Sequence, residues 1–143
     1  MILVSKCLAG FSCRYDGCSK PDRRITELVS RGLAVPVCPE ELGGLTTPRL
    51  PTELTATGEQ VLLGCGRAVM RDGTDVTREF INGAYAALRI ARDCGAERAI
   101  LKAKSPSCGN GLIYDGSFTG TLKEGSGVAA ALLKKNGIQV DTV

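Results

Sequence analysis

The sequence has no histidine and no tryptophan. The missing histidine removes the usual general base at neutral pH, any Cys–His or Ser–His dyad, and the commonest side-chain ligand of zinc. Chemistry near pH 7 must therefore use thiolates, carboxylates, lysine, tyrosine, serine or a metal.

Aromatic residues and net charge are also low. The chain has three Phe and three Tyr, and its formal net charge is only +3. This leaves little surface on which bases could stack and no basic stripe, so stable nucleic-acid binding is disfavoured. A small anionic substrate is compatible with this charge.

Long hydrophobic runs are absent as well. After Met1 only three apolar residues precede the polar pair Ser5-Lys6, which does not fit a signal peptide. No later run approaches the roughly 20 apolar residues that a membrane-spanning helix needs. We therefore expect a cytoplasmic protein with no membrane partner.

The composition is that of a globular protein, with 143 residues, 43% hydrophobic and 23% charged. This length suits one domain over residues 1–143. Short apolar runs alternate with helical patterns, which predicts a single three-layer α/β domain with a mainly parallel, Rossmann-like sheet. We expect strands at 2–5, 33–37, 99–101 and 138–140, helices at 21–31, 77–94 and 126–135, and a hairpin between 61–63 and 68–70 within a long Gly- and Thr-rich region.

The helix at 77–94 has the clearest amphipathic pattern. Its predicted buried face consists of Phe80, Ile81, Ala84, Leu88 and Ala91. Thr77 is its predicted N-cap, and Ser19 is the predicted cap of the helix at 21–31.

Seven cysteines are the most informative residues present. Cytosolic disulfides are rare and an odd number cannot pair completely within one chain. Cys7, Cys38 and Cys108 each follow a predicted strand. Because the carboxyl ends of parallel strands meet in one crevice, we expect these three thiols to come together there.

The remaining four cysteines lack this position. Cys94 is expected to be a small core residue and Cys65, between two glycines, is ambiguous. Cys13 and Cys18 are expected to be either surface thiols or thiols close to the first three.

The number of cysteines available as ligands indicates which metal centre the protein could bind. Structural zinc takes four ligands, commonly in CxxC pairs, and this chain has no CxxC. Zinc stays open because Cys13 or Cys18 could supply a fourth ligand. A [4Fe–4S] cluster on three thiolates would leave one iron free as a Lewis acid for sulfur.

Four motifs resemble the thiouracil desulfidase family, formerly a domain of unknown function. They are SKCLAG (5–10), RYDG (14–17), CPEELGGLTTPR (38–49) and KSPSCG (104–109). The resemblance implies a [4Fe–4S] cluster on Cys7, Cys38 and Cys108, loaded by iron–sulfur assembly machinery. It also implies an enzyme that replaces the sulfur of a small thiolated pyrimidine by oxygen and releases hydrogen sulfide. The family often has a residue other than Cys at position 13 and a Gly at 18, whereas both are Cys here.

The same resemblance makes Glu40 and Ser105 the expected catalytic residues. Glu40 would activate a water molecule, and Ser105 would hydrogen-bond the developing charge or relay a proton. Arg49 and Ser107 are expected to contact substrate, although the planar Arg49 side chain could instead brace nearby loops. We expect Arg14 to brace Asp16 within its turn.

Two other functions are compatible with parts of the pattern. A thiol phosphatase or arsenate reductase requires Cys-x5-Arg, but here six residues separate Cys7 from Arg14, so the register is wrong. A non-catalytic metal-binding or redox-sensing module, with zinc or an iron–sulfur cluster, remains the main alternative.

Overall fold

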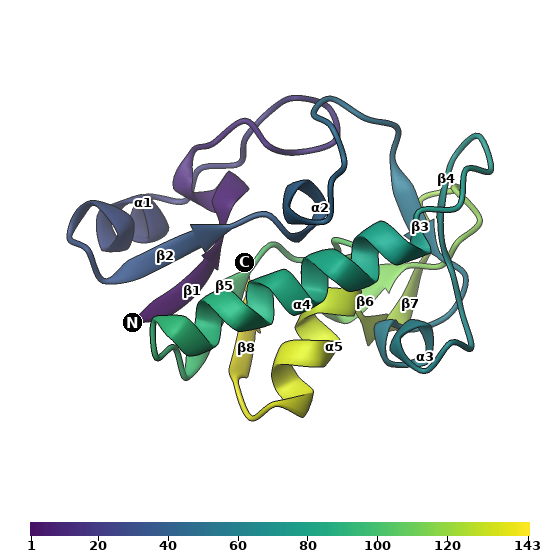
Figure 1. Ribbon diagram of the computed structural model, residues 1–143. Coiled ribbons are helices and arrows are strands. Elements are labelled where there is room, and N and C mark those ends of the chain that lie inside the picture. Colours follow the sequence, from purple (N-terminus) through teal and green to yellow (C-terminus); the bar gives the residue numbers. More distant parts are fainter.

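The computed structural model describes residues 1–143 and has a four-stranded parallel sheet at its centre. The strands are β1 (Ile2–Ser5), β2 (Ala34–Val37), β5 (Arg98–Leu101) and β8 (Gln139–Thr142), in the order β2-β1-β5-β8 (Figure 1). Every neighbouring pair is parallel.

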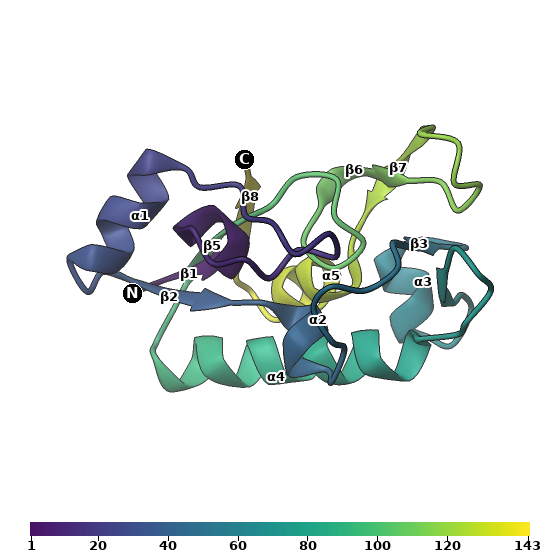
Figure 2. The ribbon, with the colours of Figure 1, turned by 90° about the horizontal axis from the view of Figure 1, so that it is seen from above.

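Helices cover both faces of this sheet. Alternate side chains of a strand point to opposite faces. Leu3 packs into a large core with α4 (Thr77–Asp93) and α5 (Val128–Lys135), whereas Val4 packs into a small core with α1 (Arg23–Ser30). Figure 2 shows α1 and α4 on opposite sides of β1 and β2. The predicted three-layer α/β fold with a parallel sheet is confirmed.

Two antiparallel hairpins extend this sheet-and-helix core. One pairs β3 (Thr52–Leu54) with β4 (Ala68–Met70), and the other pairs β6 (Asn110–Tyr114) with β7 (Leu122–Ser126). The predicted pairing of 61–63 with 68–70 is wrong. Residues 61 and 62 belong to α3 (Gly58–Leu62), because Thr57 and Gln60 form a reciprocal capping box that starts a helix there.

The predicted buried face of α4 is correct for Phe80, Ala84, Leu88 and Ala91, which are all buried, and Ile81 is partly buried against them. Both predicted caps are wrong. Asp22, not Ser19, caps α1 by accepting a hydrogen bond from the Arg24 amide, and α4 starts at Thr77 itself, with Val76 in the cap position. The carboxylate of Asp75 accepts the Thr77 amide in place of a cap residue. No helix combines the length and apolar character needed to cross a bilayer.

A short helix that the sequence pattern did not predict, α2 (Pro39–Leu42), packs against α4 through glycine. A Cβ atom added to Gly83 would lie 1.9 Å from the Pro39 carbonyl oxygen, and one added to Gly43 would lie 1.9 Å from the Glu79 carbonyl oxygen. The two backbones therefore touch. Since α2 begins directly after Cys38, this contact sets the position of that cysteine.

We expect Gly83→Ala to destabilise the protein although alanine favours helices. The gain in helix propensity is about 1 kcal/mol, whereas overpacking of this kind costs about 1–3 kcal/mol and displaces α2. Thermal unfolding measures the change. Asn82→Ala, one residue away on the exposed face of α4, is the matched control and should be neutral or stabilising. A Gly83→Ala protein as stable as wild type would contradict the backbone contact.

Candidate functional site

The three cysteines that follow strands line one cavity. Cys7 lies in the 3₁₀ helix η1 (Lys6–Ala9) directly after β1, Cys38 follows β2, and Cys108 lies in the loop after β5. The cavity has a volume of about 480 Å³, which is within the range of small-ligand pockets. The structure thus brings together thiols that are far apart in the sequence.

The loop that carries Cys108 is held by the start of α5. The amides of Gly127, Val128 and Ala130 donate hydrogen bonds to carbonyl oxygens of the loop, at 2.8, 2.9 and 3.0 Å. A Cβ atom on Gly127 would lie 2.4 Å from the Ser107 carbonyl carbon, so glycine is needed for this approach. The first turn of α5 therefore fixes the position of Cys108.

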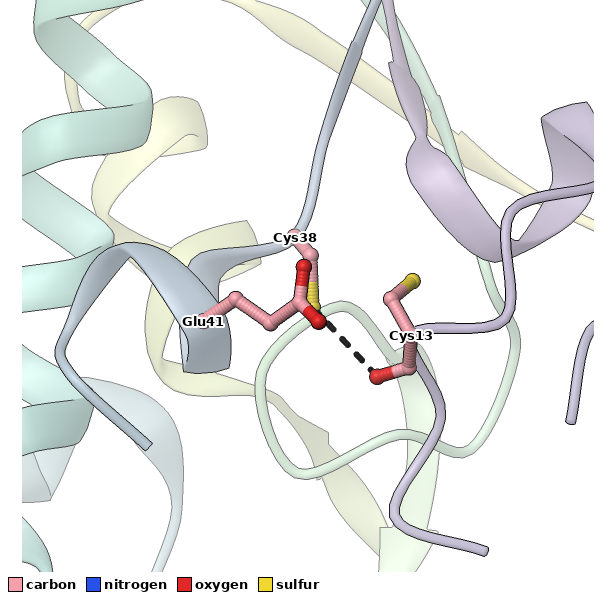
Figure 3. Close-up of side chains that lie close together, drawn as sticks. All are labelled: Cys13, Cys38 and Glu41. Carbon is pink, nitrogen blue, oxygen red and sulfur yellow. Dashed lines mark hydrogen bonds between the residues drawn. The ribbon is translucent and has the colours of Figure 1, made fainter. Parts of the chain in front are cut away.

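Cys13 joins the other thiols in this cavity. It is 4% exposed, so the surface alternative for this residue is wrong, whereas Cys18 is exposed. The Sγ atoms of Cys13 and Cys38 and a carboxylate oxygen of Glu41 all lie within 4.8 Å of one another (Figure 3). The Cys38 thiol donates a hydrogen bond to the Cys13 carbonyl oxygen at 3.8 Å. All seven cysteines are free thiols.

The surroundings favour thiolate at two of these positions. A hydrogen bond from Cys13 is the main cause that lowers the pKa of Cys7 to about 7, with help from the positive charges of Arg14 and Lys102 and opposition from burial. When the single Cys13 thiol hydrogen is shared with Cys38 instead, it lowers the pKa of Cys38, and these contacts raise the pKa of Cys13 itself. Burial raises the pKa of the Cys108 thiol. Thiolates are the form that binds metals, so Cys7 and Cys38 are prepared for that role.

Glu40 lines the same cavity with its carboxylate held at both oxygens. Oε1 accepts a hydrogen bond from Arg49 Nε at 3.0 Å, and Oε2 accepts one from the Ser107 hydroxyl at 3.3 Å. Ser107 is 2% exposed and is not among the residues that line the cavity. Ser107 thus contacts Glu40, which fixes the direction of the carboxylate.

Arg49 connects three parts of the site. Its side chain is 3% exposed and, besides Glu40, it donates to the Thr46 carbonyl, the Thr47 hydroxyl and the Cys13 carbonyl. These contacts correspond to the bracing alternative for this residue. Arg49 holds the first cysteine loop and the carboxylate of Glu40 in one fixed arrangement.

Ser105 has a hydroxyl whose accepting capacity is used by the backbone. Its Oγ accepts hydrogen bonds from the amides of Ser107 and Cys108 at 3.1 and 3.0 Å. A hydroxyl has two acceptor lone pairs and one donor hydrogen. Because both lone pairs are engaged, the Ser105 hydrogen is directed elsewhere, and Ser105 lines the cavity.

The cavity has more cationic than acidic neighbours near the thiols. Arg14, Lys102 and Lys104 all line it. The expected bracing of Asp16 by Arg14 is wrong, because the Asp16 carboxylate accepts the Cys18 amide instead and forms no ion pair with Arg14. These cations can offset the negative charge of several thiolates.

The sequence pattern did not identify the part of the cavity lining that comes from the β6–β7 hairpin. Its aromatic side chains are Tyr114 and Phe118. The Glu53 carboxylate accepts the amides of Gly116 and Phe118 at 2.9 and 3.1 Å and so holds the tip of the β6–β7 hairpin at the cavity. The turn residues Asp115-Gly116 are the sequence signal from which this hairpin could have been found.

The donor set suits a [4Fe–4S] cluster. Such clusters bind to cysteine thiolates and are tuned by nearby charge and hydrogen bonds. Here three thiols from separate loops share one cavity, two of them have lowered pKa values, and three cations lie around them. The residues present therefore fit this group.

Comparison with known proteins gives consistent matches over the whole chain. The family model described as 2-thiouracil desulfurase matches residues 2–142. An uncharacterized protein of Bacillus subtilis (strain 168), YbbK, is 49% identical over 141 residues, which are 98% of this chain and 93% of YbbK. The solved structure of the [4Fe–4S]-dependent thiouracil desulfidase TudS (DUF523Vcz) is 44% identical with a TM-score of 0.87, over 99% of this chain and 89% of that one. The chain belongs to the 2-thiouracil desulfurase family.

Proposed function

We propose that this protein is an iron–sulfur-dependent desulfidase acting on a thiouracil-like pyrimidine. Water would replace the thiocarbonyl sulfur, so that the products are the carbonyl compound and hydrogen sulfide, with no net oxidation or reduction. The observation that carries the proposal is the meeting of Cys7, Cys38 and Cys108 in one cavity beside the held carboxylate of Glu40. The 44% identity to a [4Fe–4S]-dependent thiouracil desulfidase supports it.

In this proposal Cys7, Cys38 and Cys108 hold a [4Fe–4S] cluster. When bound, the cluster supplies an iron without a protein ligand, a Lewis acid that withdraws electron density from a thiocarbonyl through its sulfur. Arg14, Lys102 and Lys104 offset the negative charge that the three thiolates bring into the cavity.

Glu40 is the proposed general base. Its Oε1 is bound by the buried Arg49 at 3.0 Å, which leaves Oε2, with its longer 3.3 Å contact to Ser107, as the oxygen that accepts a proton from water. Arg49 and Ser107 fix the direction of this oxygen, so the water is held in one orientation towards the ring carbon.

Ser105 is the proposed hydrogen-bond donor to the substrate. Because two backbone amides occupy its lone pairs, its hydroxyl hydrogen is available to the ring nitrogen or to the oxygen that develops charge. Arg49 also lines the cavity and is the proposed contact for a substrate carbonyl, as the sequence suggested. The Ser107 side chain, also suggested as a substrate contact, acts in this proposal through Glu40.

The free thiols also suggest where the protein works. Seven unpaired cysteines fit a reducing compartment, so we place the protein in the cytoplasm, where iron–sulfur assembly machinery would load the cluster.

Anaerobic reconstitution tests the proposed function. We expect a brown protein with about four iron and four sulfide per chain, which releases hydrogen sulfide from at least one member of a panel of 2- and 4-thiopyrimidines. The cluster-free chain under the same conditions is the control and should release none. A reconstituted protein with a full cluster and no sulfide release from any thiopyrimidine would contradict the proposal, and a protein that stays colourless after a chelator has removed any bound zinc would favour the binding-module alternative.

A further inference from the structure

Two side chains next to the proposed cluster ligand Cys38 are not used by the proposed reaction. Cys13 and Glu41 lie next to Cys38, and the two Sγ atoms and a Glu41 carboxylate oxygen are all within 4.8 Å of one another (Figure 3). Zinc binds thiolate and carboxylate ligands at about 2.0–2.3 Å, so donors around one ion lie about 4 Å apart. A small adjustment of these side chains therefore brings all three to zinc-binding distance.

Neighbouring groups also hold the Glu41 carboxylate and the backbone of Cys13. Glu41 Oε2 accepts a hydrogen bond from the Thr47 hydroxyl at 2.7 Å, and Oε1 accepts one from the Lys6 ammonium at 3.4 Å. The Cys13 carbonyl is held by Arg49 at 3.0 Å. Hydrogen-bonded partners of this kind fix metal ligands in place before the ion arrives.

The charges balance around a divalent ion. Two thiolates and one carboxylate contribute three negative charges, zinc contributes two positive charges, and the Lys6 ammonium beside Glu41 contributes one more. The Cys13 thiol is buried and Glu41 is 31% exposed, so the ion would be shielded on the thiol side and open on the other. This arrangement leaves room for water as a fourth ligand.

We propose that the cluster-free protein binds one Zn²⁺ through Cys13, Cys38 and Glu41. Binding releases the two thiol protons to solvent, and the Cys38 thiol gives up its hydrogen bond to the Cys13 carbonyl. The site differs from the proposed cluster site in two ligands but shares Cys38. Zinc and a cluster therefore exclude each other, a consequence that rests on the proposed function, whereas the zinc site itself does not.

The zinc site is tested on the metal-free, reduced chain with Co²⁺ as the spectroscopic probe and Zn²⁺ as competitor. We expect one Co²⁺ per chain, with thiolate-to-cobalt charge-transfer bands and the intense visible bands of tetrahedral cobalt, and displacement by Zn²⁺. Cobalt that binds without thiolate bands overturns the proposal, and this readout needs no variant.

Variants then separate the two ligand sets. Loss of a residue that hydrogen-bonds a metal ligand weakens metal binding by about 10- to 100-fold. Because Cys13→Ser removes a ligand itself, we expect it to weaken zinc binding by more than this. Cys108→Ser should leave zinc binding unchanged. The exposed Cys18→Ser is the matched control and should bind zinc like wild type. Glu41→Gln, which retains a similar shape, gives a second measure if Cys13→Ser does not fold. Equal zinc affinity of wild type and both ligand variants, or an equal loss in Cys108→Ser, overturns the site.

Competition provides the last measurement. Zinc-loaded wild type should take up no iron during anaerobic reconstitution until a chelator is added, and Cys13→Ser should take up a full cluster with zinc present. If wild type shows the zinc pattern but never forms a cluster, the proposed function fails and the zinc site stands. If the cluster forms equally well with zinc present, the shared-ligand inference fails and the proposed function stands.

Discussion

Replacing Glu40 by Gln is expected to lower the rate of sulfide release by about 10²- to 10⁴-fold, the usual contribution of a general base. Glutamine keeps the size of the side chain, and its amide oxygen can still accept the hydrogen bond from Arg49. It cannot take a proton from water. The change should therefore affect turnover and leave the iron content and visible absorbance of the reconstituted protein as in wild type.

The neighbouring Glu41→Gln is the matched control for this experiment. Glu41 lies on the same short helix but its carboxylate contacts Lys6 and Thr47 rather than Arg49. We expect turnover close to wild type with a normal cluster. Full activity of Glu40→Gln, or an equal loss in both variants, would remove Glu40 from the mechanism.

Loss of any proposed cluster ligand is expected to have an equally large effect on the iron and sulfide content of the reconstituted protein. Serine in place of Cys7, Cys38 or Cys108 leaves a hydroxyl that does not ionise at neutral pH, so nearly all iron and sulfide should be lost on reconstitution. Iron and sulfide per chain, measured after desalting, give the result, and circular dichroism shows whether the fold is kept.

Two cysteines outside the cavity serve as controls for the ligand experiment. Cys18 and Cys65 are both exposed, and their serine variants should reconstitute like wild type. Cys13→Ser is the more demanding comparison, because Cys13 lies in the cavity but is not a proposed cluster ligand. A chain that keeps its cluster without Cys108 and loses it without Cys13 would show that the ligand set is different from the one proposed.

The sequence pattern was most informative where function depends on strand ends. The apolar runs around Leu3 and Ala99 predicted parallel strands, and the rule that loops meet at the carboxyl edge of such a sheet placed Cys7 and Cys108 together. This inference needs only the type and order of the elements. It does not depend on exact boundaries, which differed by one or two residues for several helices and strands.

Contacts made by single side chains over long sequence distances could not be predicted in this way. The pairing of Arg49 with Glu40 and the approach of Ser107 to the same carboxylate depend on how two loops fold over the cavity. Burial of Cys13 has the same origin, because nothing in its local sequence distinguishes it from the exposed Cys18.

The β6–β7 hairpin was missed for a different reason. Strand β6 exposes three of its five residues, including Leu112, so it lacks the buried alternation that identifies a strand. Its position comes from pairing with β7 and from Glu53, which holds the tip of the hairpin. The aromatic side chains that this hairpin contributes to the cavity, Tyr114 and Phe118, were therefore not predicted either.

The attachment of the Cys108 loop to the first turn of α5 bears on whether the chain needs its cofactor in order to fold. In small zinc domains the ligands come together only when the metal binds, so the metal-free chain is unfolded. Here amides from Gly127, Val128 and Ala130 already hold the loop by hydrogen bonds within the protein, and α5 is itself part of the main core. We therefore expect the chain to fold before any iron arrives, so that a protein that has lost its cofactor to air takes up a cluster again without refolding.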